Sequence, residues 1–261
     1  MSGQTDRVIP GVALFATCLV DLFRPSVGFA AARLLERAGF TVHVPPQACC
    51  GQPAFNSGDE ERARDVARAF VDTFSRYEYV VTPSGSCASM IRFDMPRLFD
   101  GASGPAALRA LEVAEKTWEL TAFLVESGGA EIIDAENRAT VTYHDGCSGL
   151  RKLSIREQPR ELLRAVRGLT LVEYEGAAQC CGFGGTFCVK FPELSTEMCH
   201  KRCAQIAESA ADELIGGEMG CLMNLSGAMA RQGQPIGARH VAEVLAGMTD
   251  TPALGRGKGS V

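Results

Sequence analysis

Two sets of four cysteines repeat the same order and almost the same spacing along the chain. In the first set, 30 residues separate a single cysteine from a Cys-Cys-Gly triplet, and 36 residues separate the second triplet cysteine from the last cysteine. The corresponding intervals of the second set are 32 and 39 residues. Self-similarity of this kind indicates a duplicated unit. The eight residues are Cys18, Cys49, Cys50, Cys87, Cys147, Cys180, Cys181 and Cys221.

The chemistry open to these residues is that of thiolates, which are soft ligands for iron–sulfur clusters or zinc. Neighbouring cysteine side chains diverge, so an adjacent pair suits two irons of one cluster better than one small ion. The glycine that follows each pair lets backbone amides approach the sulfurs, and such hydrogen bonds tune the reduction potential of a cluster. The short C-x2-C runs of cubane ferredoxins and zinc sites are absent from the sequence. We expect all eight cysteines to hold one or two iron–sulfur clusters.

Composition narrows the class of protein. The chain has 261 residues, of which 46% are hydrophobic and 22% are charged, as is typical of globular proteins. Its net charge of −5 and its lack of a long basic tract argue against a nucleic-acid partner. The longest apolar stretches, such as Val12 to Val20, are about half as long as a membrane span, so we expect no transmembrane segment.

The cysteine count bears on the compartment. Eleven cysteines is an odd number, and the first seven residues contain no apolar signal segment. We therefore expect a cytoplasmic protein whose thiols stay reduced, which favours a metal or redox role over disulfides.

Strand and helix patterns alternate through both halves. The expected strands, each running toward a cysteine, are 12–17, 41–44, 79–82, 139–143, 170–173 and 212–215. The expected helices between them are 27–38, 59–77, 158–167 and 193–209. This alternation predicts an α/β protein of two pseudo-symmetric βαβ-type halves with parallel sheets. The cysteine-rich loops would then meet at the C-terminal edges of the strands, where open parallel sheets collect ligands.

The duplication predicts two domains. Residues 1–125 would form the first cysteine-rich repeat, including a helix at 105–127 that bridges the halves, and residues 126–261 would form the second. Three further cysteines, Cys188, Cys199 and Cys203, have no counterpart in the first half, and the sequence leaves their roles open. The same holds for His144, which could donate a hydrogen bond to a cluster, accept a proton, or make an ordinary structural hydrogen bond.

Several segments resemble the lactate utilization protein A family of the Cys-Cys-Gly cysteine-rich domain superfamily. The resemblance covers about residues 8–248 and lies chiefly in segments 15–25, 48–58, 83–87, 144–147, 180–187 and 221–224. It implies an iron–sulfur subunit that acts in oxidising L-lactate to pyruvate, with two partner subunits, one of which carries ferredoxin-type clusters. More distant relatives act in glycolate, glycerol-3-phosphate and heterodisulfide metabolism, and in the heterodisulfide relatives the unit binds a non-cubane [4Fe–4S] cluster.

Departures from these relatives leave the cluster type open. The heterodisulfide relatives end each unit in C-x2-C, whereas the two units here end in Cys87-Ala88-Ser89-Met90 and Cys221-Leu222-Met223-Asn224. No catalytic acid, base or flavin site is legible, so whether this chain is itself an enzyme stays open. Three other functions also stay open: a structural zinc scaffold, a subunit of a related glycolate- or heterodisulfide-type oxidoreductase, and a thiol–disulfide switch that uses the vicinal cysteines.

Overall fold

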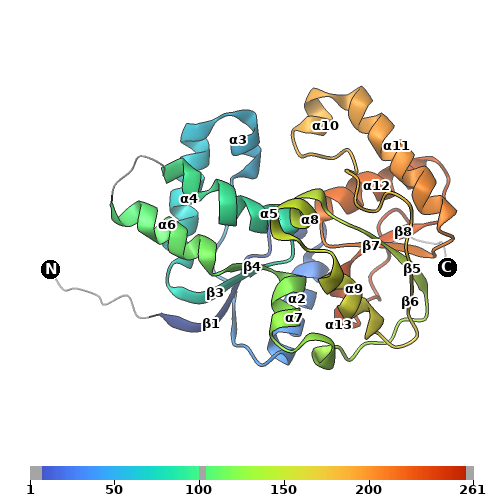
Figure 1. The fold of residues 1–261 in the computed structure, drawn as a ribbon, viewed down its shortest axis with the longest axis horizontal. Helices are drawn as coiled ribbons and strands as arrows, with labels where there is room; N and C mark the ends of the chain where they lie inside the picture. Colours follow the sequence, from blue (N-terminus) through green and yellow to red (C-terminus); the bar gives the residue numbers. More distant parts are fainter. Residues whose placement is uncertain (1–7, 100–103, 257–261) are drawn as a thin grey trace.

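The computed structural model describes residues 8–99 and 104–256. The segment in which we looked for an N-terminal signal, residues 1–7, lies outside the described residues. Two sheets, each of four parallel strands, form the two halves of the molecule (Figure 1). The predicted α/β class with two similar halves and parallel sheets is therefore confirmed.

The two sheets have matching topologies. The first has the order β2-β1-β3-β4, and the second has the order β6-β5-β7-β8. The strands of the first are β1 (Ile9–Leu14), β2 (Val42–His43), β3 (Tyr77–Thr82) and β4 (Thr117–Glu119). The strands of the second are β5 (Thr140–His144), β6 (Thr170–Val172), β7 (Glu213–Gly216) and β8 (Gly237–His240).

Helices connect the strands in both halves. Those of the first half are α1 (Cys18–Phe23), α2 (Pro25–Arg37), α3 (Gln52–Ser57), α4 (Glu60–Phe74), α5 (Gly85–Ser89), α6 (Pro105–Glu115) and α7 (Leu120–Glu126). Those of the second half are α8 (Cys147–Leu153), α9 (Glu157–Arg164), α10 (Phe187–Lys190), α11 (Pro192–Glu208), α12 (Met219–Arg231) and α13 (Val241–Ala246). None of the described helices is both long and apolar enough to cross a membrane.

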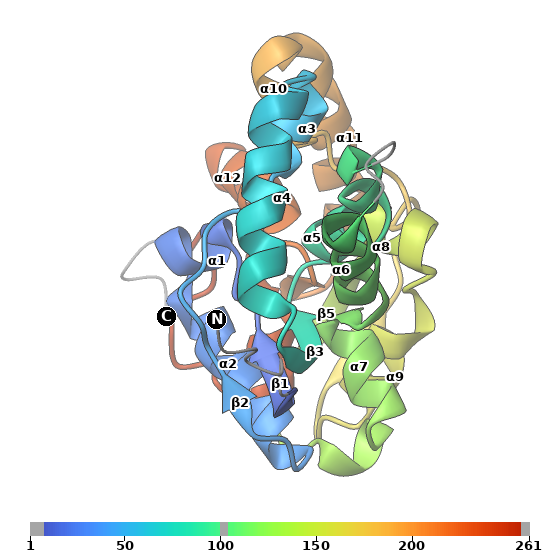
Figure 2. The same ribbon diagram turned by 90° about the vertical axis from the view of Figure 1, so that its left-hand side faces the viewer.

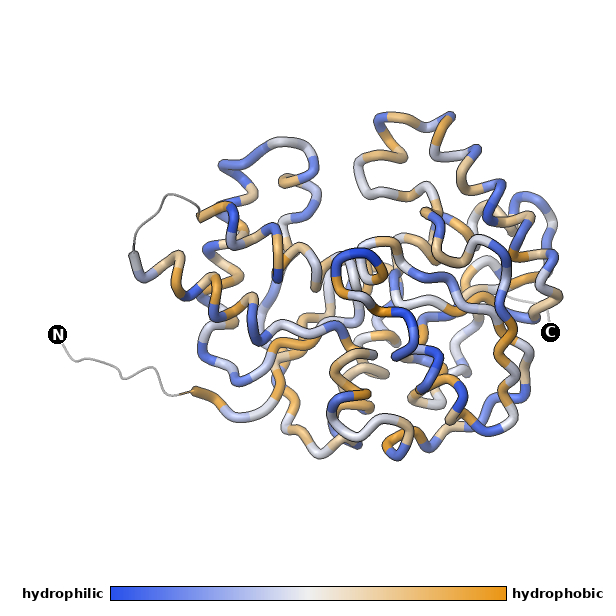
Figure 3. The backbone as a smooth tube through the Cα atoms, viewed as in Figure 1, coloured by the Kyte–Doolittle hydropathy of each residue, from blue (hydrophilic) through white to orange (hydrophobic). Residues whose placement is uncertain are grey.

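Helices cover both faces of the first sheet, because alternate side chains of its central strand pack into two different hydrophobic cores. Val12 and Leu14 pack into one hydrophobic core with α2 and α7, whereas Ala13 and Phe15 pack into another with α4 and α6. A strand covered on both faces must be apolar throughout, as this one is. Figure 3 shows polar and apolar residues alternating around the outer helices, which is typical of helices packed on one side only.

Local signals explain where the main helices begin. Pro25 opens α2, a position where the missing N–H costs nothing. The Asp59 side chain caps α4 by accepting a hydrogen bond from the Arg62 amide, and Glu60 and Glu61 follow in the first turn.

The prediction of a single helix over 105–127 is wrong in its middle, because β4 separates α6 from α7. Neither β4 nor β8 was predicted. The first has only three residues, and the second has the sequence Gly-Ala-Arg-His, which carries no apolar alternation. Both strands are specified by pairing with the strand beside them rather than by their own pattern.

Each half contributes a helix that packs against a helix of the other half. Helix α13 packs against α2 of the first half, and α7 packs against α9 of the second. Helix α5 likewise contacts α8, and α12 contacts α1, as a pseudo-twofold relation requires. The larger hydrophobic core accordingly contains residues from both halves. The boundary between residues 125 and 126 stays a prediction.

We expect the Gly85→Ala variant to lower the free energy of unfolding by about 1–3 kcal/mol through overpacking. A Cβ atom at Gly85 would lie 2.9 Å from the Gly149 Cα, where α5 crosses α8. Chemical denaturation measures the loss. The control is Gly227→Ala on α12, whose nearest neighbour outside its own helix backbone is 3.5 Å away and which should be neutral or stabilising. Equal stability of the two variants would contradict the close approach.

Candidate metal centres

The structure brings the predicted cysteines to the carboxyl ends of the parallel strands. Cys18 and Cys147 are the first residues of α1 and α8, which follow the central strands β1 and β5. Cys87 and Cys221 lie in the first turns of α5 and α12, after β3 and β7. The two Cys-Cys-Gly triplets occupy the loops after β2 and β6. Side chains that are far apart in sequence therefore meet at one edge of each sheet.

Within each half, four thiols form a continuous series. In the first half, the thiol of Cys18 lies beside that of Cys49, Cys49 lies beside Cys50, and Cys50 lies beside Cys87. The second half repeats this series in the order Cys147, Cys180, Cys181 and Cys221. The Sγ atoms of Cys181 and Cys221 are 2.9 Å apart. We call these two sets the first and second quartets.

Crowding of the thiols separates their pKa values in the same way in both quartets. Hydrogen bonds from Cys18 and Cys50 lower the pKa of Cys49 far below its ordinary value, and hydrogen bonds from Cys147 and Cys181 do the same for Cys180. The pKa values of the neighbouring thiols rise, because each neighbour donates to that thiolate and is itself desolvated. Each quartet thus favours the ionised form of one sulfur, and thiolates are the form that binds metals.

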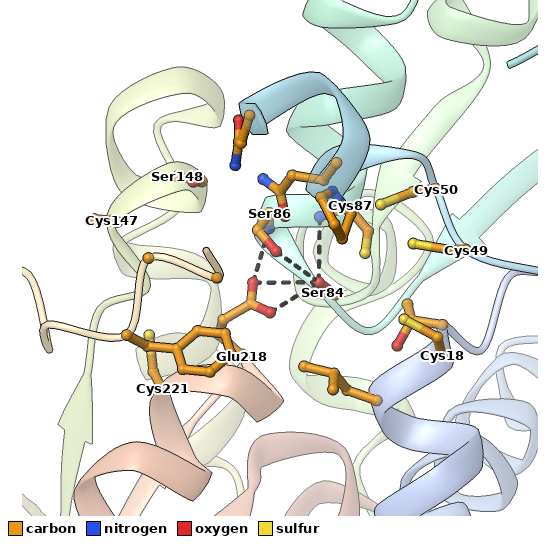
Figure 4. A pocket seen from close by; sticks show the side chains of 18 of the residues that line it. Cys18, Cys49, Cys50, Ser84, Ser86, Cys87, Cys147, Ser148, Glu218 and Cys221 are labelled. Carbon is orange, nitrogen blue, oxygen red and sulfur yellow. Dashed lines mark hydrogen bonds between the residues drawn. The ribbon is translucent and has the colours of Figure 1, made fainter. Parts of the chain in front are cut away.

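Both quartets line the same cavity, whose volume is about 260 Å³. In Figure 4, the labelled cysteines of the first quartet stand on one side of this cavity, and Cys147 and Cys221 stand on the other. Because residues of both halves line the cavity, it is shared between the halves, and both quartets face it. Helices α3 and α10, one from each half, stand at the same end of the molecule (Figures 1 and 2).

A carboxylate that the sequence analysis missed lies in this cavity. Glu218, at the N-terminus of α12, accepts hydrogen bonds from the Ser84 hydroxyl at 3.0 Å and from the Ser86 amide at 2.8 Å (Figure 4). Burial raises the pKa of its carboxyl group. Because Ser84 and Ser86 belong to the first half and Glu218 to the second, the contact ties the two quartets together. No local sequence pattern marks Glu218, since its partners lie more than 130 residues away.

The glycine of each triplet has a backbone conformation that other residues rarely adopt. Gly51 has φ of +88° and Gly182 has φ of +87°. This turn directs the Gly182 amide to the Cys180 sulfur at 3.4 Å, and the Gly51 amide likewise hydrogen-bonds Cys49. The expected approach of backbone amides to sulfur is present in both quartets.

We expect the Gly182→Ala variant to lose about 1–3 kcal/mol of stability and to distort the second quartet, because a Cβ atom there would lie 2.5 Å from the Ser195 carbonyl oxygen. Gly185→Ala is the matched control: Gly185 also has positive φ (+62°), but nothing lies within 4 Å of its Cβ position. Thermal unfolding and metal content of both variants measure the difference. If the two variants behaved alike, backbone strain alone would account for the effect.

His144 lies beside the second quartet. A ring nitrogen of this residue and the sulfurs of Cys181 and Cys221 all lie within 4.8 Å of one another. Its Nδ1 is 2.6 Å from the Tyr174 hydroxyl, and its Nε2 is buried without a hydrogen-bond partner. Burial lowers the pKa of His144 to about 4, so the imidazole is neutral at physiological pH.

The remaining cysteines lie apart from the quartets. Cys199 and Cys203 are buried in the core between α11 and α12, and their thiols donate to the carbonyls of Asn224 and Leu225. The Cys188 thiol donates to the Gly185 carbonyl.

The donor sets fit a thiolate-held metal or iron–sulfur centre. Each quartet offers four converging sulfurs, one of which has a lowered pKa, together with a backbone amide aimed at it. Soft thiolates select zinc and iron–sulfur clusters over hard cations.

Comparison with known proteins identifies the family of the chain. Residues 12–92 and 141–226 each match the family model of the CCG cysteine-rich domain. The chain is 46% identical to lactate utilization protein A of Anoxybacillus flavithermus, over 90% of this chain and 98% of that protein. It is 43% identical to lactate utilization protein A of Bacillus subtilis, with the same two coverages.

A solved structure shares the fold. A hypothetical protein from Helicobacter pylori superposes with a TM-score of 0.63 at 11% sequence identity. The match covers 93% of this chain and 50% of that one, so this chain spans about half the length of the Helicobacter protein.

Proposed function

We propose, since this chain belongs to the lactate utilization protein A family of cysteine-rich domain proteins, that it is the iron–sulfur electron-transfer subunit of a complex that oxidises L-lactate to pyruvate. The family supports a role in lactate utilization. The direction of the reaction and the identity of the cofactor are our own inference.

One observation carries the proposal: two equivalent quartets of cysteine thiols line a single cavity. Cys18, Cys49, Cys50 and Cys87 would hold one cluster, and Cys147, Cys180, Cys181 and Cys221 would hold the other. A [4Fe–4S] cluster held by cysteine thiolates supplies one-electron chemistry when bound. Oxidation of a secondary alcohol to a ketone releases two electrons, which matches two one-electron centres in one chain.

The chain's own residues would prepare this cavity for electron transfer. The Gly51 and Gly182 turns hold amides against Cys49 and Cys180, which favours the ionised sulfur that a cluster requires. Glu218 links the second half to the Ser84–Ser86 loop and so helps to hold the two quartets at a fixed separation. Short, fixed separation is what transfer between two centres requires.

We place the oxidation of the hydroxy acid itself on a partner. The sequence carries no legible flavin site or dinucleotide fingerprint, since Gly182-Phe183-Gly184-Gly185 lacks the G-x-G-x-x-G spacing. We propose two partner subunits, one of which carries ferredoxin-type clusters and exchanges electrons with this chain.

The proposal is tested on the complex purified anaerobically from cells grown on L-lactate through a tag on this chain. Adding L-lactate should bleach the visible absorption of the clusters and produce pyruvate, whereas D-lactate and buffer should not. A complex with cysteine substitutions in both quartets should still assemble but should show no bleaching. Clusters that dithionite reduces but that L-lactate leaves oxidised would contradict the proposed substrate.

A structural zinc scaffold is the second candidate. His144, Cys181 and Cys221 form a buried group of the ligand types that zinc prefers. Zinc would leave the protein colourless, whereas iron–sulfur clusters would make it brown.

A further inference from the structure

The two quartets are not surrounded by the same side chains, although the duplication makes them equivalent in sulfur. One difference lies at the residue three positions before the first cysteine of each set. In the second half this residue is His144, and in the first half it is Phe15. Phe15 directly follows β1 and His144 ends β5, so the two residues occupy equivalent positions at the carboxyl ends of the central strands.

Phe15 is an apolar residue in the core next to the first quartet. It is fully buried in a cluster that includes Cys50 and Cys87, and its ring packs edge-on against Phe70 at a centroid distance of 5.1 Å. A phenyl ring at this position offers no N–H or O–H group to the sulfurs.

His144 provides a polar group at the matching place. Its side chain is almost wholly buried, with 1% of its surface exposed, and its Nε2 has no hydrogen-bond partner in the described part of the chain. Native proteins seldom leave such an atom without a partner, and an unpaired one calls for an explanation. The sulfurs of Cys181 and Cys221 lie within 4.8 Å of its ring.

Tyr174 decides which nitrogen carries the proton. Its hydroxyl lies 2.6 Å from His144 Nδ1, and the two rings are nearly parallel at an angle of 22°. The phenol is itself buried, so its O–H needs an acceptor, and the lone pair of Nδ1 supplies one. With Nδ1 accepting, the neutral imidazole carries its hydrogen on Nε2, on the side without a protein partner.

We propose that His144, oriented by Tyr174, donates its Nε2–H to the sulfurs of the second centre and thereby gives this centre a higher reduction potential than the first. The inference rests on the proposed iron–sulfur function. A cluster gains one negative charge on reduction, and a hydrogen bond to its sulfurs stabilises that charge. Electrons that reach this chain would therefore collect on the second centre, and the duplicated quartets would have distinct roles.

The test is a potentiometric titration of the anaerobically purified chain, followed by EPR, with iron and sulfide measured on each sample. The wild type should show two midpoints. His144→Phe, which copies the first half, should make reduction of the second centre about tenfold less favourable, or about 59 mV for one electron, at unchanged iron content. His43→Phe, a change of the same kind at a histidine whose ring contacts Pro10 and Tyr77, should leave both midpoints unchanged.

A second variant keeps the imidazole and removes only its orienting group. Tyr174→Phe frees the tautomer of His144, so the higher midpoint should fall by less than in His144→Phe, and the iron content should stay the same. Unchanged midpoints in both variants at full iron content would overturn the inference. A loss of half the iron in His144→Phe would also overturn it, because His144 would then be a ligand rather than a donor. Absence of iron and sulfide from the wild type would instead overturn the proposed function.

Discussion

Replacing Cys180 by alanine is expected to remove about four of about eight irons per chain while the fold survives. Cys180 stands within the second series, where its sulfur contacts those of both Cys147 and Cys181. Its side chain lies on a loop at the sheet edge and is only half-buried, so little packing is lost with it. Cys49→Ala and Cys50→Ala should remove the other half of the iron. Iron and acid-labile sulfide analysis measures the loss, and circular dichroism checks the fold.

Two further variants sharpen this experiment. The Cys49→Ala/Cys180→Ala double variant should lose all of the iron, whereas Cys188→Ala should lose none, because Cys188 hydrogen-bonds outside the second series. Full iron content in both Cys49→Ala and Cys180→Ala would refute the assignment of the quartets as ligands. Loss of all iron from either single variant would show that the quartets bind one shared cluster.

The second large effect concerns the contact between α2 and α13. Glu243 is fully buried, and its carboxylate accepts hydrogen bonds from Arg24 Nε at 2.9 Å and from the Ser26 hydroxyl at 2.6 Å. The Glu243→Ala variant would leave the Arg24 guanidinium buried beside an uncharged methyl group. We expect it to lower the free energy of unfolding by about 3–5 kcal/mol. Denaturant unfolding monitored by circular dichroism measures this loss.

The matched control is an exposed ion pair. Glu60 and Arg64 pair one helical turn apart on the surface of α4, with a distance of 4.0 Å, so Glu60→Ala should cost less than about 1 kcal/mol. The double variant Arg24→Met/Glu243→Leu removes both buried charges and should recover much of the loss. If Glu243→Ala were no more costly than Glu60→Ala, the buried pair would not hold the halves together.

Much of the fold could be predicted because the same order of strands, helices and cysteines occurs in both halves of the sequence. The strand patterns at 12–17 and 139–143 correspond to β1 and β5, and the matching spacings of the cysteines identify the two halves as a repeat. The cysteines then marked the carboxyl ends of the strands. By contrast, β4 and β8 are short and follow no pattern of their own, so only pairing with β3 and β7 specifies them.

The parts of the site that could not be predicted depend on contacts between distant segments. Glu218 belongs to the site because it hydrogen-bonds Ser84 and Ser86 of the other half. Tyr174 belongs to it because its hydroxyl contacts His144, 30 residues earlier. Neither pair has a spacing that a motif could encode. The reciprocal packing of α7 and α13 is hidden for the same reason, because helical periodicity shows that a face is buried but not which helix covers it.

The most direct test of two iron–sulfur centres in this chain is the content of iron, acid-labile sulfide and zinc in anaerobically purified protein, with a visible spectrum and EPR. We predict about eight irons with matching sulfide per chain, divided equally between the two quartets. Zinc without sulfide, in a colourless protein, would contradict the electron-transfer function and leave the duplicated quartets as a structural metal scaffold.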